Sequence, residues 1–109
     1  MAEPTLTEVF GAGATQTATT ITITKADLPG LTPSANNSAE SLLAAIALKG
    51  QAGLTQVTFD TNIDQSLYLE NGFSSFTTRG EAGVSYRVDQ VTINLAKVDS
   101  GATLDPDDY

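Results

Sequence analysis

The residue types that most often carry enzyme chemistry are missing from this sequence. Its 109 residues include 0 histidines and 0 cysteines, which excludes Ser/His/Asp and Cys/His nucleophile systems and the common zinc sites. Carboxylates remain, and a hydrolase would need two of them facing each other in a cleft, one with a raised pKa. A domain this small rarely holds such a cleft, so we expect no enzyme. The carboxylates considered are Asp60, Asp64, Glu70, Glu81 and Asp89.

One group of residues has the spacing of metal ligands. Asp60, Asn62 and Asp64 match the first three oxygen positions of a calcium-binding loop. The match fails at Gln65, where the sharp turn needs glycine, and at Asn71, where the loop needs a closing acid. Local side-chain hydrogen bonds in an Asp/Asn-rich turn explain the same residues. We therefore expect a turn and no cofactor, with calcium binding as the less favoured alternative.

The charge balance limits the partners that the chain can bind. Thirteen acidic residues against five basic ones give a net charge of −8, so a phosphate backbone would be repelled and nucleic acid is not an expected partner. No apolar run is long enough to span a membrane, and the first residues lack the pattern of a signal peptide, so we expect synthesis in a cytoplasm. The basic residues are scattered singly: Lys25, Lys49, Arg79, Arg87 and Lys97.

The longest β pattern in the chain occupies residues 84–98, and its apolar positions change parity halfway. An extra residue at 89–90, a β-bulge, would place both apolar sets on one buried face. Each set alternates with polar residues, as expected of a strand. The two sets are Val84, Tyr86 and Val88, then Val91, Ile93 and Leu95.

The other elements follow from periodicity and turn residues. A helix is expected at 38–49, because Asn37 and Glu40 have the spacing of a capping pair and Gly50 is a good C-terminal stop. Asn71-Gly72 is a strong hairpin signal and would join the strand that precedes it to the strand expected at 73–78. The remaining strands are expected at 19–24, 55–59, 63–69 and 73–78, with a further turn at 80–83.

This order of elements predicts a mainly β (α+β) fold. We expect an antiparallel β-sandwich or partly open barrel of five to six strands with one α-helix packed on it. The chain would consist of an extended N-terminal arm at 1–17, a β-rich core domain at 18–98 and an acidic C-terminal tail at 99–109. The expected core residues are Ile21, Ile23, Leu43, Ile46, Val57, Phe59, Leu67, Leu69, Tyr86, Val88, Val91, Ile93 and Leu95.

Both ends of the chain carry a few residues that could bind another protein. The arm has too little apolar surface to fold alone, but its large side chains would bury useful area against a partner. The aspartates of the tail would add salt-sensitive attraction to basic groups. The expected partner-binding residues are Leu6, Val9 and Phe10 in the arm and Leu104, Asp107, Asp108 and Tyr109 in the tail.

Taken together, the chain without cysteine or histidine, the Gly/Ala-rich arm around Gly11–Ala14, the threonine-rich strands with one helix and the acidic tail resemble small virion structural proteins of tailed bacteriophages. The nearest kind is the capsid cement or decoration protein. The resemblance concerns overall organisation and rests on no diagnostic motif. It implies a module that joins neighbouring major capsid subunits, reaches them with its termini, forms a homo-oligomer in the assembly and ends up in the virion after synthesis in the bacterial host cytoplasm.

Two other readings remain open. A tail, neck or baseplate component would have much the same organisation. A small acidic β-sandwich could instead be a binding module that depends on calcium or carbohydrate, or a regulator that blocks a basic surface. The carbohydrate version is weakened by the absence of tryptophan, because only Tyr68, Tyr86 and Tyr109 could stack on a sugar.

Overall fold

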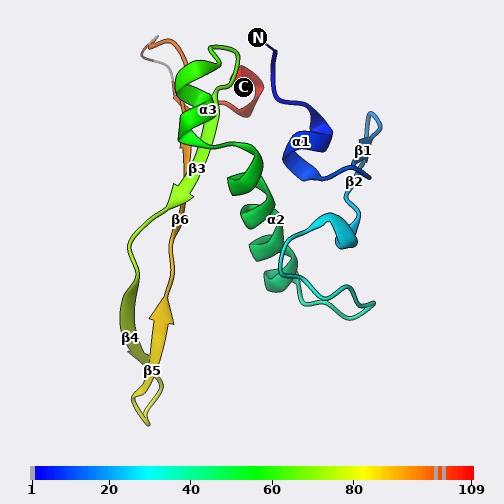
Figure 1. Cartoon of the computed structure of the whole chain (residues 1–109). Helices are drawn as coiled ribbons and strands as arrows, with labels where there is room; N and C mark the ends of the chain where they lie inside the picture. Colours follow the sequence, from blue (N-terminus) through cyan, green and yellow to red (C-terminus); the bar gives the residue numbers. More distant parts are fainter. Residues whose placement is uncertain (1, 100, 102) are drawn as a thin grey trace.

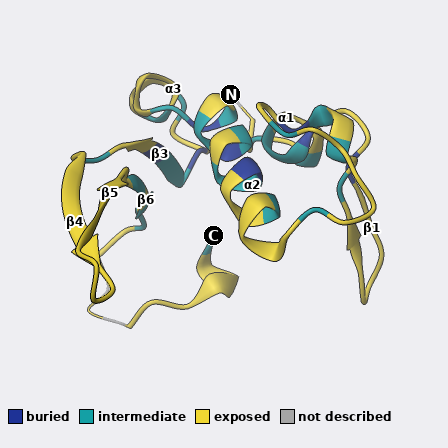
Figure 2. Cartoon of the chain, turned by 90° about the horizontal axis from the view of Figure 1, so that it is seen from below, coloured by how far each residue is buried: buried dark blue, intermediate teal, exposed yellow. Residues whose placement is uncertain are grey.

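The computed structural model describes residues 2–99, 101 and 103–109. One main helix, α2 (Ala39–Gly53), lies between a long two-stranded ribbon on one side and the N-terminal segments on the other (Figures 1 and 2). The described residues form six antiparallel strands in three two-stranded sheets, so the α+β class is confirmed. A sandwich or partly open barrel is not confirmed by this arrangement. Besides α2, the elements are α1 (Leu6–Phe10), β1 (Thr15–Gln16), β2 (Ile21–Thr22), η1 (Lys25–Asp27), α3 (Gln56–Thr61), β3 (Leu67–Asn71), β4 (Ser75–Arg79), β5 (Val84–Val88), β6 (Val91–Leu95) and η2 (Pro106–Asp108).

The main helix is longer than predicted at its C-terminal end. The Ser38 hydroxyl caps the N-terminus by accepting the backbone N–H of Ser41 at 3.1 Å, so the cap is one residue later than predicted. Asn37 instead orders the preceding loop, since its side chain donates to the Thr32 carbonyl at 3.0 Å. The helix was predicted to end at Gly50, but it continues through this residue. This glycine is buried, and its lack of a side chain lets the helix approach Leu69 of β3 closely.

Two short helices replace segments that were predicted to be extended. Thr5 caps α1 by accepting the backbone N–H of Glu8 at 3.2 Å, and Thr55 caps α3 by accepting that of Thr58 at 3.1 Å. The arm at 1–17 is therefore not extended throughout, and the strand predicted at 55–59 is wrong. Threonine favours strands by its branched side chain, but at a helix start its hydroxyl satisfies a free N–H group.

The strand predicted at 19–24 is reduced to a two-residue ladder. In β2, Ile21 pairs with Gln16 of β1, and both strands are exposed to solvent. The tight turn between them is held by Thr17, whose hydroxyl accepts the backbone N–H of Thr20 at 3.1 Å. This hairpin contributes no large buried side chain, so it is an appendage of the fold and not the half-buried strand that the alternation predicted.

The last four strands form one long ribbon with a single turn. Strand β3 pairs with β6 and β4 pairs with β5, so the chain runs out along β3 and β4 and returns along β5 and β6 (Figure 1). The turn is at residues 80–83, as predicted, where Gly80 and Gly83 adopt positive φ angles of 79° and 65°. The hairpin predicted at Asn71-Gly72 is wrong, because the chain continues through this dipeptide without reversing.

The two halves of the ribbon differ in register by one residue. Strand β3 ends with Asn71 opposite Val91, and β4 begins with Ser75 opposite Val88. Three residues between β3 and β4 therefore face two residues between β5 and β6. The irregularity lies level with residues 89–90, where the bulge was predicted. The extra residue, however, is in the segment between β3 and β4 and not in the segment between β5 and β6.

The long strand continues its alternation from β5 as far as Asp89. Arg87 and Asp89 hydrogen-bond to each other, so they project to the same side, as two residues of a regularly alternating strand do. The predicted single buried face of the long strand is wrong, because most of its apolar side chains are exposed: Val84, Tyr86, Val88, Ile93 and Leu95.

The core is small and lies where α2 meets α1 and β3 (Figure 2). Leu69 is 7% exposed, its side chain contacts Gly50, and its backbone N–H donates to the Leu54 carbonyl at 2.8 Å. It is the only predicted core residue that is buried. The buried apolar residues are Ala14, Leu28, Ala45, Leu54 and Leu69. Predicted core residues that are instead exposed are Ile21, Leu43, Val57, Tyr86, Val88, Ile93 and Leu95, and half-buried ones are Ile23, Ile46, Phe59, Leu67 and Val91.

The chain is much more open than a compact protein of its size. Its accessible surface is 7927 Å², whereas a compact monomer of 11.3 kDa exposes about 5,700 Å², a difference of about 2,200 Å². Its radius of gyration is 16.6 Å, against about 13 Å for a compact domain of this length. Among the described residues, the fold therefore leaves many large apolar side chains exposed, such as Phe76, Val57 and Ile63.

Candidate interaction surface

The most exposed part of the fold is the outer half of the ribbon, which we call the distal ribbon and define as residues 75–88. Every residue of β4 and β5 is exposed (Figure 2). Large apolar side chains are nevertheless present, with Tyr86 42% and Phe76 73% exposed. The Arg79 guanidinium lies 5.0 Å from the centre of the Tyr86 ring, a cation–π contact on the ribbon surface.

A cluster of polar side chains holds the distal ribbon at its base. The Asp89 carboxylate accepts hydrogen bonds from the Ser74 hydroxyl at 2.8 Å and from Arg87 Nε at 2.9 Å. The side chain of Gln90 accepts the backbone N–H of Phe73 at 3.1 Å, which satisfies a group that the register change would leave free. Cross-strand bonds thus continue through the irregular position and fix the direction of the distal ribbon.

The hydrogen bonds from Arg87 and from Ser74 lower the pKa of Asp89 below its ordinary 3.8. Since a lowered folded-state pKa contributes stability above the ordinary value, this contribution is lost as the pH falls through the lowered pKa. We expect Arg87→Ala to raise the pKa of Asp89 toward 3.8, measured by NMR titration of its carboxyl carbon. Arg79→Ala removes the same charge from the same ribbon and should leave this pKa unchanged; equal shifts in both variants would contradict the contact.

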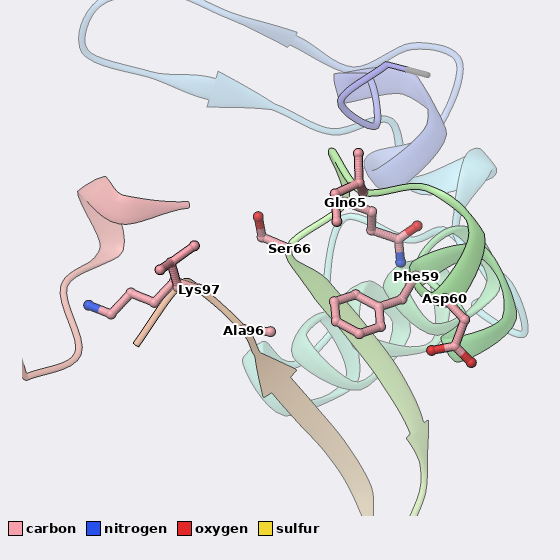
Figure 3. A pocket seen from close by; sticks show the side chains of 8 residues that line it. Phe59, Asp60, Gln65, Ser66, Ala96 and Lys97 are labelled. Atoms are coloured by element: carbon pink, nitrogen blue, oxygen red, sulfur yellow. The ribbon is translucent and has the colours of Figure 1, made fainter. Parts of the chain in front are cut away.

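An open groove of about 450 Å³ lies between α3 and the end of β6. Its floor includes Phe59, whose ring lies 4.9 Å from that of Tyr68. Gln65 is buried beside it and donates to the carbonyls of Thr55 at 3.1 Å and Leu67 at 2.7 Å, so its amide joins α3 to β3. Figure 3 shows the Asp60 carboxylate directed away from the amine of Lys97, which lies at the other end of the groove.

Of the predicted calcium-type residues, Asp60 lies in α3, and Asn62 and Asp64 follow its end. Asn62 Oδ1 accepts the backbone N–H of Asp64 at 3.1 Å, the local bond of an Asp/Asn turn, and its amide donates to the Ala2 carbonyl at 2.8 Å. Both the oxygen and the nitrogen of the Asn62 side-chain amide are thus engaged in hydrogen bonds. Within residues 2–99, 101 and 103–109, no group of three or more acidic side chains is placed to hold a metal ion.

The five carboxylates considered for acid/base chemistry lie on separate parts of the fold. Asp60 is in α3 and Asp64 follows it, whereas Glu70 is in β3. Glu81 lies at the tip of the distal ribbon, and Asp89 is at its base in the cluster with Arg87. The groove contains Asp60 alone of the five. These five residues therefore do not form the facing pair of carboxylates that a carboxylate-based hydrolase needs.

The predicted partner-binding residues of the arm lie on α1. Leu6, Val9 and Phe10 are half-buried, and α1 packs against α2. The contact is close at Gly53, whose Cα lies against the backbone carbonyl of Glu8. These residues therefore take part in the small core, and their predicted role in binding another protein stays a prediction.

The predicted partner-binding residues of the tail are held near the end of the ribbon. Lys97 Nζ lies 2.7 Å from an Asp108 carboxylate oxygen and 3.3 Å from the Thr103 carbonyl. Leu104 is 64% exposed, and Asp107 is exposed beside it, whereas Tyr109 is half-buried. The tail therefore presents apolar and acidic side chains while one ion pair anchors it.

The hydrogen bond from Lys97 to Asp108 raises the pKa of Lys97 above its ordinary 10.5. A raised folded-state pKa contributes stability below the ordinary value, and this is lost as the pH rises through the raised pKa. We expect Asp108→Asn to lower this pKa and to increase the mobility of residues 104–109, measured by NMR relaxation. Asp107→Asn removes the same charge next to this pair and is the control. Unchanged mobility in Asp108→Asn would contradict the anchoring role.

Sequence reasoning missed the distal ribbon as a surface, because its alternating apolar residues also fit a buried strand. A usable signal was the pair of glycines at residues 80 and 83, preceded by the short threonine- and serine-rich strand Ser75–Arg79. No helix in the described part of the chain has the length and apolar character needed to cross a membrane. Comparison with protein-family models, curated proteins and solved structures found no match to the chain.

Proposed function

We propose that this chain is a non-enzymatic structural subunit of a phage virion, of the capsid cement or decoration kind, that joins neighbouring major capsid subunits. The observation that carries the proposal is the open fold. About 2,200 Å² more surface is exposed than a compact protein of this mass would expose. Large apolar side chains, such as Phe76 and Ile93, are part of this exposed surface, and exposed apolar patches are typical of a chain that is completed by neighbours in an assembly.

The arrangement of the ends supports the same role. Leu104 and Asp107 in the tail are both exposed, while Lys97 holds the tail through Asp108. A net charge of −8 favours attachment to a basic protein surface and disfavours contact with nucleic acid. In this role a second layer comes from a neighbouring subunit that covers the exposed apolar residues of α2, such as Leu43 and Leu48.

The test mixes the purified chain with empty shells assembled from major capsid subunits of tailed phages. We expect it to sediment with a matching shell and to raise the melting temperature of the shell, because a ligand of the assembled state stabilises that state. Deletion of residues 99–109 should reduce co-sedimentation and leave the melting temperature of the free chain nearly unchanged. Leu104→Asp is a sharper variant, and Thr103→Asp is its matched control in the adjacent position.

Two results would overturn the proposal as stated. If the chain stays in the supernatant with every shell but binds purified tails, necks or baseplates, its place is elsewhere in the virion. If it binds neither, and instead binds calcium, a carbohydrate or a basic protein in calorimetry, the binding-module reading replaces the structural one.

A further inference from the structure

We propose that the distal ribbon is an interface between two copies of this chain, formed when the face that carries Val84, Tyr86 and Val88 packs against the same face of a second copy. This inference goes beyond the proposed function and does not depend on it, because it concerns the isolated chain in solution. It assigns a partner to the part of the fold that has the least contact with the rest of the molecule.

Within the part of the chain that the structure describes, no element covers the distal ribbon. A two-stranded hairpin is marginally stable in water unless a further strand or a helix covers its apolar face. Here all ten residues of β4 and β5 are exposed, and α2 packs against β3 near Leu69, at the other end of the ribbon (Figure 1). The apolar side chains of the distal ribbon are therefore available to another molecule.

The ladder register identifies which face is suited to this contact. Opposite residues of an antiparallel pair project to the same side. The pairing therefore places three large apolar side chains of β5 on one face and leaves one, Phe76, on the other. That other face also carries Arg87, which is engaged with Asp89. The residues of the apolar face are Ser75, Thr77, Arg79, Val84, Tyr86 and Val88.

Charge distribution favours a copy of the same chain as the occupant. Within residues 72–91 the charged side chains are Arg79, Glu81, Arg87 and Asp89, which cancel. The whole net charge of −8 is therefore carried by the rest of the chain. Two copies repel each other over most of their surface, and the distal ribbon is the region where they approach without this repulsion. A strongly basic partner would gain little from binding here.

The contact face is small compared with a standard interface. Such an interface buries about 800 Å² on each partner from about 20–30 residues, whereas this face has the six residues named above. We therefore expect a weak, concentration-dependent dimer. The bonds from Ser74 and Arg87 to Asp89 also fix the ribbon before binding. Less conformational freedom is then lost on association than with a flexible loop.

The first experiment measures molar mass by sedimentation equilibrium across a range of concentrations. We expect the wild-type chain to approach twice 11.3 kDa as concentration rises. Tyr86→Asp should raise the dissociation constant by roughly 30-fold or more, as for a central interface residue. Thr78→Asp introduces the same charge on the opposite face of the same ribbon and should leave the constant nearly unchanged. Circular dichroism of both variants checks that they fold.

The second experiment avoids any loss of an apolar side chain. The sequence holds 0 cysteines, so a single introduced thiol reports on one position. Thr77→Cys lies opposite Tyr86 on the proposed contact face, and Thr78→Cys lies on the other. Under mild oxidation we expect a disulfide-linked dimer from Thr77→Cys at least 10-fold faster than from Thr78→Cys, because the proposed twofold contact brings equivalent positions together.

Three outcomes overturn the inference. A wild-type chain that stays at 11.3 kDa at all concentrations has no such interface. A dimer that Tyr86→Asp leaves intact but Leu43→Asp on α2 disrupts uses another surface. Equal disulfide formation by Thr77→Cys and Thr78→Cys indicates random collision. None of these results bears on binding to phage shells, so failure here and failure of the proposed function are distinguishable.

Discussion

Leu69→Ala is expected to lower the free energy of unfolding by about 2–5 kcal/mol, the range for truncating a buried leucine. Leu69 is 7% exposed and lies against Gly50 and Leu54, so the lost side chain would leave a cavity between α2 and β3. This contact attaches the ribbon to the helix. Chemical denaturation monitored by circular dichroism measures the loss directly.

The matched control is the residue directly opposite in the ladder. Ile93 pairs with Leu69, has a side chain of the same size and is 55% exposed. Ile93→Ala should therefore cost less than half as much. Leu43→Ala, at a position 69% exposed on α2, should change stability by no more than about 0.5 kcal/mol. Equal losses for Leu69 and Ile93 would mean that the face of β6 is covered as fully as that of β3.

The second large effect is expected at Gly53, the last residue of α2. A methyl group there would meet the backbone carbonyl of Glu8 in α1, and a carbonyl cannot move without displacing α1. We expect Gly53→Ala to destabilise the chain by about 1–3 kcal/mol, as overpacking does. The cost of this overpacking is expected to exceed the gain in helix propensity, which is about 1 kcal/mol for alanine over glycine. Chemical denaturation and the NMR shifts of Leu6–Phe10 measure the two consequences.

Gly50→Ala is the control within the same helix. Its added methyl group would lie 3.3 Å from a terminal methyl group of Leu69, a side chain that can move slightly. Because the gain in helix propensity is the same, Gly50→Ala should be neutral or stabilising. If Gly53→Ala is as well tolerated, α1 does not pack on α2 as described.

Local signals predicted the main helix and the ribbon turn well. The run of alanine and leucine after Ser38 and the glycines at 80 and 83 act through the backbone near them. The Asn71-Gly72 signal failed because this glycine serves another purpose. A methyl group on Gly72 would lie 2.7 Å from the side chain of Gln90, so glycine is required here for a close approach between strands.

The burial of side chains could not be predicted from the pattern alone. Alternation in Val84–Val88 and Val91–Leu95 predicts that each strand has an apolar face. It does not predict which element, if any, covers that face. Here α2 covers β3 at Leu69 and leaves Ile93 largely open. The same limit applies to the candidate surface, because an apolar face that binds another chain has the same sequence pattern as one that packs inside a domain.

The nested pairing of the ribbon also sets the order in which it can form. Arg79 and Val84 close the shortest loop, whereas Leu67 and Leu95 close the longest, and the entropy cost of closure rises with loop length. The ladder therefore grows from its tip toward α2. Its main anchor, Leu69, pairs late, although α2 precedes it in the chain and is synthesised first. During folding the ribbon passes through a stage in which its strands are paired but not anchored, which makes this stage the one most open to pairing with other chains.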